Sequence, residues 1–222
     1  MEPELARMAP KGVSIHVTRL LLQGKASRES YIAMAEATSR ASTELSAAEP
    51  DAVAYGCTTG AIFEGDEAVI HRIKEIVGDI PVVTTASAVV DALKALRIKR
   101  VAVATPYLQA VNEEEKEYLE RRGFVVSRIF GLEMGHNDTE RKLIGRQPPG
   151  AAYRIAREVY TPDADGILIS CTNFATLPII EQLETELGKP VVTSNQATFW
   201  ALLRRVGLKD KLEDVGILFQ EA

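Results

Sequence analysis

The sequence predicts an α/β protein of two pseudo-symmetric lobes, each a mostly parallel sheet flanked by helices, with the active site in the cleft between them. Three observations support this fold class. Strand-like apolar runs alternate with helical patterns, one short phrase occurs twice, and similar elements follow each copy of it. Alternation of this kind is typical of parallel sheets whose connecting helices cover both faces.

The repeated phrase ends at the only two cysteines of the chain, Cys57 and Cys171. In each copy an acidic residue is followed by a short apolar run, a small residue and then Cys-Thr. Further on, Pro81-Val-Val-Thr-Thr85 and Pro190-Val-Val-Thr-Ser194 each open a helical pattern. We infer that the chain contains two copies of one unit, each with a thiol at the carboxyl end of a strand.

Helices in the first half are predicted from apolar residues at helical spacing. The longest begins at Ser27, a typical N-cap residue, and runs to about Leu45. The others are predicted at 3–8, 69–77 and 86–96. Two strands are predicted between helices, one at Val13–Val17 from its alternation of apolar and polar residues and one at 52–55 from its short apolar run.

The second half repeats this alternation. Its predicted strands are 101–104, 124–130 and 166–169, and its predicted helices are 111–122, 151–159, 179–187 and 195–206. The acidic run Glu113–Glu117 predicts a solvated helix face. The polar segment Gly131–Pro149 predicts a long loop with a helical turn, and loops of this size are often functional.

We expect a first lobe over residues 1–98 and a second over 99–222. The helix and strand at the start of the chain match a helix and strand of the second copy, with equivalent turns at Gly12 and Gly123. The second copy has a further strand and loop ahead of that helix, at Arg100–Tyr107. The first lobe is therefore expected to lack its opening strand, and the C-terminal helix is expected to pack back on it.

Composition and charge exclude several classes of protein. The 222 residues, 46% of them hydrophobic, are enough to bury a real core. A net charge of −5 provides no basic surface, so no nucleic-acid partner is expected. No apolar stretch reaches membrane-spanning length and the first residues are not a secretory leader, so we expect a cytoplasmic protein with no membrane partner.

The cysteines have three alternative interpretations: small buried apolar residues, a disulfide, or metal ligands. Two cysteines without a signal peptide indicate a reducing compartment, which argues against a disulfide. No other histidine or cysteine lies at ligand spacing from either thiol, which argues against a metal site. Their matching positions, where open α/β sheets bind ligands, favour paired functional thiols with no metal or organic cofactor.

Three motifs carry a resemblance to a known superfamily: Tyr55-Gly-Cys-Thr-Thr-Gly60, the Thr105-Pro-Tyr107 loop with Val111-Asn-Glu113, and Ser170-Cys-Thr-Asn173. They resemble the aspartate/glutamate racemase superfamily, and within it the maleate cis–trans isomerase and arylmalonate decarboxylase branch. Amino-acid racemases usually show Cys-Asn-Thr and Cys-Thr-Glu at the two thiols, and the decarboxylases typically carry glycine in place of the first cysteine. Because both cysteines are present, the resemblance favours the isomerase.

The resemblance implies a role for each thiol. Cys57 would be the nucleophile that adds as a thiolate to the double bond of maleate. The adduct has a single bond where the alkene was, so it can rotate and eliminate as fumarate. Cys171, on the opposite face, would supply or remove the proton. A thiolate is a soft nucleophile that suits an activated alkene.

The resemblance also implies residues that bind the substrate, a small dicarboxylate or another carboxylate. These are Thr58 and Thr59 beside the first thiol, Thr172 and Asn173 beside the second, Tyr107 at the reacting carboxylate, and Asn137 in a mobile loop. Alternatively, the threonines cap helices, the tyrosine packs in the core and Asn137 is a turn residue. A homodimer is common in the superfamily and is expected for this chain.

One departure leaves the activity open. The isomerase branch normally has a first strand and a loop of Pro-Ser-Ser-Asn type ahead of a segment like Met1–Leu5, and the asparagine of that loop binds substrate. That asparagine cannot be assigned in this sequence. Two alternatives therefore stay open: a cofactor-free arylmalonate-type decarboxylase or racemase that uses the thiols for proton transfer next to a carboxylate, and a carboxylate-binding protein without catalysis.

Overall fold

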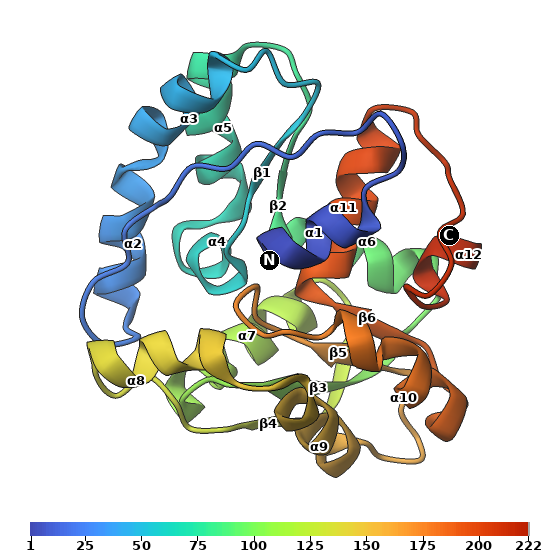
Figure 1. Cartoon of the computed structure of the whole chain (residues 1–222). Coiled ribbons are helices and arrows are strands. Elements are labelled where there is room, and N and C mark those ends of the chain that lie inside the picture. The colour runs from blue at the N-terminus through green and yellow to red at the C-terminus, as the bar shows by residue number, and fades with distance from the viewer. Residues whose placement is uncertain (222) are drawn as a thin grey trace.

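The structure is a computed structural model that describes residues 1–221 of the chain. A parallel four-stranded sheet has the order β4-β3-β5-β6, and a second, parallel pair is formed by β1 and β2 (Figure 1). The strands are β1 (Val53–Tyr55), β2 (Val82–Thr84), β3 (Arg100–Thr105), β4 (Val125–Gly131), β5 (Gly166–Ile169) and β6 (Val191–Thr193). The fold is α/β, as the sequence predicts.

Helices connect the strands and cover both faces of the larger sheet. They are α1 (Glu2–Met8), α2 (Arg28–Glu36), α3 (Thr38–Ser46), α4 (Thr58–Glu64), α5 (Asp66–Val77), α6 (Thr85–Ala95), α7 (Gln109–Arg121), α8 (Asp138–Leu143), α9 (Pro149–Val159), α10 (Ile180–Leu187), α11 (Ser194–Arg205) and α12 (Leu218–Glu221), with 3-10 turns η1 (Ile144–Arg146) and η2 (Leu177–Ile179). Helices α9 and α10 contact one face of the larger sheet, and α7 contacts the other.

The central strands β3 and β5 are apolar on both sides because helices cover both faces. Residues 101–104 and 167–169 are fully buried. Runs of this kind are typical of parallel strands in α/β proteins. They fix the carboxyl end of β5, and with it Cys171, in a buried setting.

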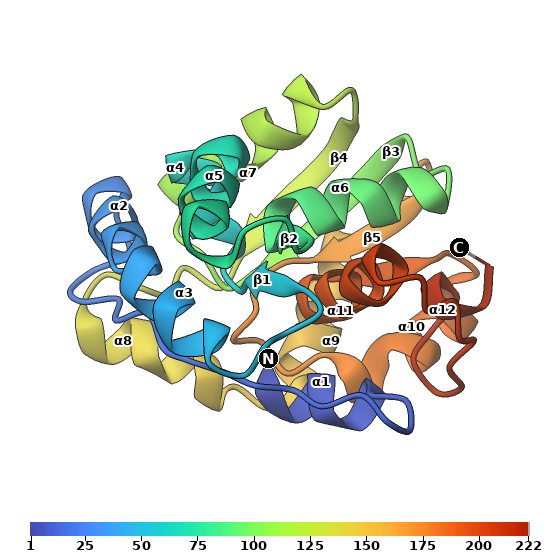
Figure 2. The ribbon, with the colours of Figure 1, turned by 90° about the horizontal axis from the view of Figure 1, so that it is seen from above.

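The duplication is visible in the two strand pairs that lead into α6 and α11. Thr84 at the end of β2 and Thr193 at the end of β6 each form a capping box with the residue three positions later, Ser87 and Gln196. The two helices pack against each other (Figure 2), and Thr198 donates a 3.0 Å hydrogen bond to Thr85. Helix α11, the helix predicted at 195–206, therefore packs against elements of the first half.

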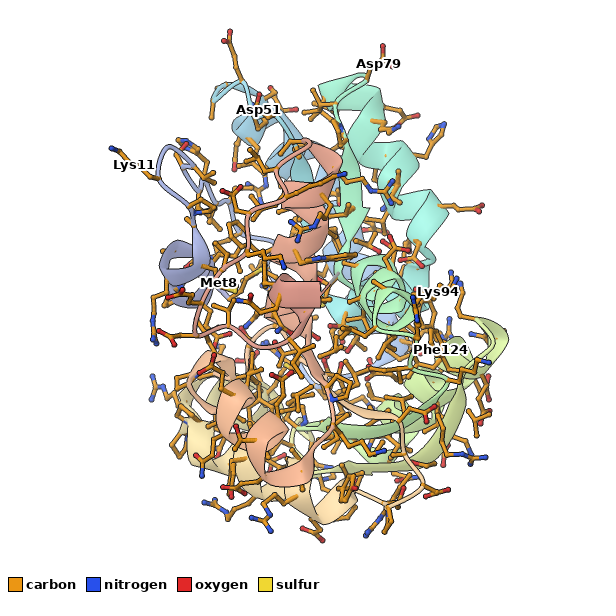
Figure 3. The ribbon with its side chains drawn as sticks, turned by 90° about the vertical axis from the view of Figure 1, so that its right-hand side faces the viewer. Met8, Lys11, Asp51, Asp79, Lys94 and Phe124 are labelled. Atoms are coloured by element: carbon orange, nitrogen blue, oxygen red, sulfur yellow. The ribbon has the colours of Figure 1, made fainter. Side chains whose placement is uncertain are left out.

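The smaller sheet points its carboxyl ends toward the larger one. Asp51 and Asp79, which come just before β1 and β2, lie at the far end of the molecule with their side chains pointing outward (Figure 3). The strands run inward from there, so Cys57, which follows β1, lies toward the middle of the molecule. The division of the chain into lobes at residues 98 and 99 stays a prediction.

Three element predictions need correction. Val13–Val17 is extended but forms no strand. In the second half β4 pairs with β3, whereas among the described residues the first half has no strand in the place of β3 with which this segment could pair. The predicted long helix is two helices, α2 and α3, which meet at Ala37, with Ser27 as the N-cap of the first. The segment Gly131–Pro149 is more helical than expected, since it contains α8 and η1.

Candidate active site

Cys57 lies where β1 ends and α4 begins. It is the N-cap residue of α4, and its Sγ accepts a hydrogen bond from the Gly60 backbone N–H at 3.3 Å. The side chain is half-buried. Burial raises the pKa of the thiol to about 12, against the opposing effect of the Gly60 and Thr59 N–H groups. A thiol with a pKa in this range is protonated at neutral pH.

Cys171 follows β5 in a strained backbone conformation. Its φ is +122°, in a region that residues other than glycine rarely adopt. Its N–H donates a 3.0 Å hydrogen bond to Ser194 Oγ at the start of α11. Burial raises the pKa of this thiol, while the nearby Tyr107 hydroxyl lowers it. The sequence predicts a helix near both thiols, but only Cys57 caps one, since the next helical turn after Cys171 is η2, which begins at Leu177.

Two hydrogen-bonded bridges hold the cysteine segments side by side. In the first, Thr58 Oγ1 lies 2.9 Å from Ser194 Oγ, which also accepts from the Cys171 N–H. In the second, Thr172 Oγ1 donates to the Gly56 carbonyl oxygen at 3.0 Å. The thiols are close enough for the charge of Cys171 to raise the pKa of Cys57. Residues far apart in the sequence thus bring the two thiols to one place.

Tyrosine hydroxyls surround the thiols. Tyr107, buried at the end of β3, is near enough to Cys171 for its hydroxyl to lower the pKa of that thiol, and Thr59 is near enough to Tyr107 and Tyr31 to lower the pKa of both phenols. Burial raises the pKa of both phenols well above the usual range, so both stay neutral donors. Tyr31 comes from α2 and stacks on Phe63 with ring centroids 5.5 Å apart.

The loop that carries Tyr107 is fixed from behind. Thr105 Oγ1 accepts from the Tyr107 backbone N–H at 3.0 Å and donates to Asn112 Oδ1 at 2.6 Å. Both Thr105 and Asn112 are fully buried. The Thr-Pro-Tyr motif and the Val-Asn-Glu motif are thus parts of one support that orients the tyrosine toward the second thiol.

The two predicted asparagines lie further out. Asn137 is exposed and caps α8, where its side-chain oxygen accepts from the Glu140 N–H at 2.9 Å. Asn173 is exposed, and its side chain lies near Gly145, at the 3-10 turn after α8. Of the predicted residues, the structure brings together Cys57, Thr58, Thr59, Tyr107, Cys171 and Thr172. Substrate contacts by the asparagines stay a prediction.

The sequence interpretation missed two residues of this site. Ser194 bonds to both cysteine segments. The repeat could have pointed to it, because Ser194 ends the phrase Pro190–Ser194 at the position where Thr85 ends the matching phrase Pro81–Thr85. Tyr31 lies on a helix that follows a long irregular segment, and no local pattern points it at the thiols. Within residues 1–221, no group of three or more histidine, cysteine or acidic side chains could hold a metal ion, and no helix there is long and apolar enough to cross a membrane.

A two-fold repeated α/β fold with one thiol at the strand end of each repeat defines the aspartate/glutamate racemase-like class of proteins. Within it, the chain belongs to the arylmalonate decarboxylase family, whose model matches residues 1–219. The repeat and the paired Cys-Thr phrases of the sequence are thus features of a recognised family, and the predicted superfamily branch is confirmed.

The similar proteins include maleate isomerases. The chain is 30% identical to the maleate isomerase of Nocardia farcinica, over 98% of this chain and 88% of the other. It superposes with a TM-score of 0.91 and 26% identity on a variant of the maleate isomerase Iso from Pseudomonas putida S16 with maleate, covering 100% of this chain and 92% of the other. A variant of the Nocardia farcinica enzyme with a covalently bound succinylcysteine intermediate gives a TM-score of 0.88 at 26% identity, covering 99% and 91%.

Proposed function

We propose that the protein is a maleate cis–trans isomerase that uses a nucleophilic cysteine and a second, acid/base cysteine. The observation that carries this proposal is the meeting of two differently held thiols at one site, Cys57 at a helix start and Cys171 on a strained turn. The similar isomerase with a bound succinylcysteine supports a covalent route through one thiol.

In the proposed reaction, the Cys57 thiolate adds to one alkene carbon of maleate. A sulfur–carbon bond forms, the π electrons move to the neighbouring carbon, and that carbon takes the proton of the Cys171 thiol. The succinyl adduct then rotates about the carbon–carbon bond that was the alkene and is now single. The Cys171 thiolate removes a proton, the electrons re-form the double bond, and the carbon–sulfur bond breaks to release fumarate and the Cys57 thiolate.

The neutral donors around the thiols suit two carboxylates. Thr58 and Thr59 adjoin the nucleophile, Thr172 adjoins the acid, and Tyr107 donates from the β3 end. Asn137 and Asn173 are proposed to join them when substrate is bound. We add Tyr31, because its hydroxyl shares Thr59 with Tyr107. This set contains no basic side chain, so a dicarboxylate would be held by hydrogen bonds rather than ion pairs.

The resting state of the thiols sets a pH dependence. Because burial raises the pKa of Cys57 to about 12, its thiolate fraction increases tenfold with each pH unit below that value. We therefore expect kcat/KM for maleate to increase with pH from 6 to 9. A rate that falls over this range would mean that Cys57 is not the group that must lose a proton.

The test is proton NMR of the reduced protein with maleate, run beside Cys57→Ser and Cys171→Ala. Fumarate formed by the wild type and by neither variant is the expected result. A well-folded wild type that forms no fumarate would contradict the proposal. A control with Val17→Ser, an exposed apolar residue in the extended segment before α2, should leave the rate unchanged.

A second candidate is decarboxylation of a disubstituted malonate, which the name of the matching family favours. That reaction needs one proton donor at the carbon that loses carbon dioxide, and Cys171 could supply it. Activity on such a malonate that survives Cys57→Ser but not Cys171→Ala would select this candidate, because only the isomerase needs the first thiol as a nucleophile.

Assembly and location complete the proposal. We propose a homodimer, as the resemblance implies, with lobes at 1–98 and 99–222, in the cytoplasm. The reducing cytoplasm would keep both thiols free for catalysis. Light scattering of the purified chain measures the dimer directly, and a monomeric mass at micromolar concentration would refute it.

A further inference from the structure

Glu115 is a buried acid that the proposed reaction does not use. It lies on α7 and is 2% exposed, whereas its neighbour Glu117 is exposed and pairs with Arg121 at 3.2 Å. The prediction that Glu113–Glu117 forms a solvated helix face is therefore wrong for Glu115. The helix turns this one side chain inward, toward the end of β5.

The Glu115 carboxyl faces the residue that precedes the second thiol. Its Oε2 and the Ser170 Oγ are both fully buried, and neither has a hydrogen-bond partner of ordinary distance and angle. The two are near enough for the Ser170 hydroxyl to oppose the main effect of burial, which raises the pKa of Glu115 to about 7. Native proteins rarely leave buried polar atoms unsatisfied, so this pair calls for an explanation.

The matching position of the first repeat shows what a purely structural acid looks like. Because Gly12 and Gly123 are equivalent positions of the two repeats, Glu4 is the residue of the first repeat that corresponds to Glu115. Glu4 is fully engaged: Oε1 accepts from the Thr176 and Leu177 N–H groups at 2.5 and 2.6 Å, and Oε2 accepts from Asn195 at 2.6 Å. Glu115 has no such set of donors.

We propose that Glu115 is a positioning residue for the second thiol: its buried carboxylate, behind Ser170, keeps Cys171 in the thiol form that gives a proton to the substrate carbon. The role as a proton donor rests on the proposed function. The charge of Glu115 raises the pKa of Cys171, which is the direction that an acid needs. Once Cys171 has given its proton, the same charge makes its thiolate a stronger base for the return step.

The other ionisable groups around Glu115 are few or already paired. Tyr107 and Cys171 both respond to its charge. On the elements that pack against α7, Glu64 of α4 pairs with Arg72, and Arg128 of β4 donates to the Glu158 carbonyl oxygen. On α7 itself, Glu113 accepts from Gln109, Glu114 pairs with Arg28, Lys116 pairs with Glu120, and Tyr118 donates to Asp66, which also pairs with Arg122. Cys171 itself also faces Tyr31 and the Met1 ammonium, which donates to the Thr172 carbonyl oxygen at 2.8 Å. Both groups are the same in Glu115→Gln and in its control, so Cys171 is the reactive group through which a change at Glu115 should be seen.

A thiol titration tests this without turnover. In a Cys57→Ser background Cys171 is the only thiol, and the pH dependence of its alkylation by iodoacetamide, followed by intact mass, reports its ionisation. We expect Glu115→Gln to move the alkylation midpoint down by about one pH unit, or about tenfold in thiolate at a fixed pH. The matched control Glu117→Gln should not move it. An unchanged midpoint in folded Glu115→Gln would overturn the proposal.

A second measurement covers the case in which Glu115→Gln does not fold. In the Cys57→Ser protein, the infrared band of a protonated buried carboxyl should disappear with a midpoint near 7, the pKa that burial gives Glu115. The alkylation rate of Cys171 should deviate from a single titration at that same pH, and a single titration throughout would overturn the proposal. If Glu115→Gln shifts the alkylation midpoint of Cys171 but the wild type does not turn over maleate, the isomerase proposal alone is contradicted. If the wild type turns over maleate but the midpoint is unshifted, the role of Glu115 alone is contradicted.

Discussion

Cys57 and Cys171 occupy matching ends of matching strands, yet their surroundings differ. Cys57 has an ordinary extended φ of −148°, caps a helix and is half-buried. Cys171 has a φ of +122°, caps no helix, donates its N–H to Ser194 and lies near the Tyr107 hydroxyl. The repeat brings two thiols to one site, and the differences around them fit the proposed roles of Cys57 as the nucleophile and Cys171 as the proton donor.

The acids behind the two repeats differ in the same way. Glu4 satisfies three buried donors and fixes α1 to the segment after Cys171. Glu115, at the matching position, faces only Ser170. One acid stabilises the fold, while the other is kept in a setting that costs stability, as is common at functional sites.

The largest expected effects come from replacing either thiol. Cys57→Ser should lower kcat for maleate by at least about a thousandfold, because a hydroxyl is a far weaker nucleophile at neutral pH. Cys171→Ala should lower it by about a hundred to ten thousandfold, the usual contribution of an acid/base group. Steady-state assays of fumarate formation measure both. Equal activity of either variant and the wild type would show that the two thiols do not divide the chemistry.

Glu4→Ala should have the next largest effect, on stability. It would leave the Thr176 and Leu177 N–H groups and the Asn195 amide without partners in a buried place, at a cost of about 4 kcal/mol in the free energy of unfolding. Glu2→Ala is the matched control, because Glu2 lies on the same helix and pairs with exposed Arg19. Urea unfolding compares the two. A loss below about 1 kcal/mol would mean that Glu4 does not anchor α1.

Glu115→Gln should instead increase the free energy of unfolding relative to the wild type, and only at high pH. The folded protein binds the Glu115 proton more tightly than the unfolded chain, since the pKa is raised from 4.5 to about 7. The wild type therefore loses stability as pH rises from about 4.5 to 7, whereas the variant does not. Between pH 5 and pH 8 the variant should gain about 2.5 kcal/mol relative to wild type. Parallel pH dependences would contradict a buried, titrating carboxyl.

The smallest effect concerns the donors around the second thiol. Tyr107→Phe removes the hydroxyl that lowers the pKa of Cys171 but keeps the buried ring, so we expect kcat to fall about tenfold with little change in stability. Tyr31→Phe, whose hydroxyl shares Thr59 on the Cys57 side, should raise KM more than it lowers kcat. The reverse pattern would exchange the proposed roles of the two tyrosines.

Sequence alone predicted the fold class and the central part of the site because both follow from the repeat. The matching phrases placed Cys57 and Cys171 at strand ends, and those strands are β1 and β5. The prediction was wrong at Val13–Val17, since alternation shows that a segment could be a strand but not that a neighbour is present to pair with it.

The roles of Glu115 and Tyr31 could not be predicted in this way. A run of acidic residues on a helix gives no sign of which one faces inward, and α7 buries only one member of its run deeply. Tyr31 reaches the thiols because α2 packs on α4, a contact between segments of unrelated pattern. Ser194 was within reach of the repeat, because it occupies the place of Thr85.

The most direct test of the division between the thiols is the intact mass of Cys171→Ser and Cys57→Ser after incubation with maleate. We expect the Cys171→Ser protein to gain the mass of one maleic acid, added at Cys57 as a succinyl thioether and located by peptide mapping. Its nucleophile is intact, water protonates the neighbouring carbon more slowly than the Cys171 thiol would, and the return step lacks its base. The Cys57→Ser protein should gain nothing. An adduct on Cys171 in the Cys57→Ser protein, or no adduct on folded Cys171→Ser, would contradict the assignment of roles.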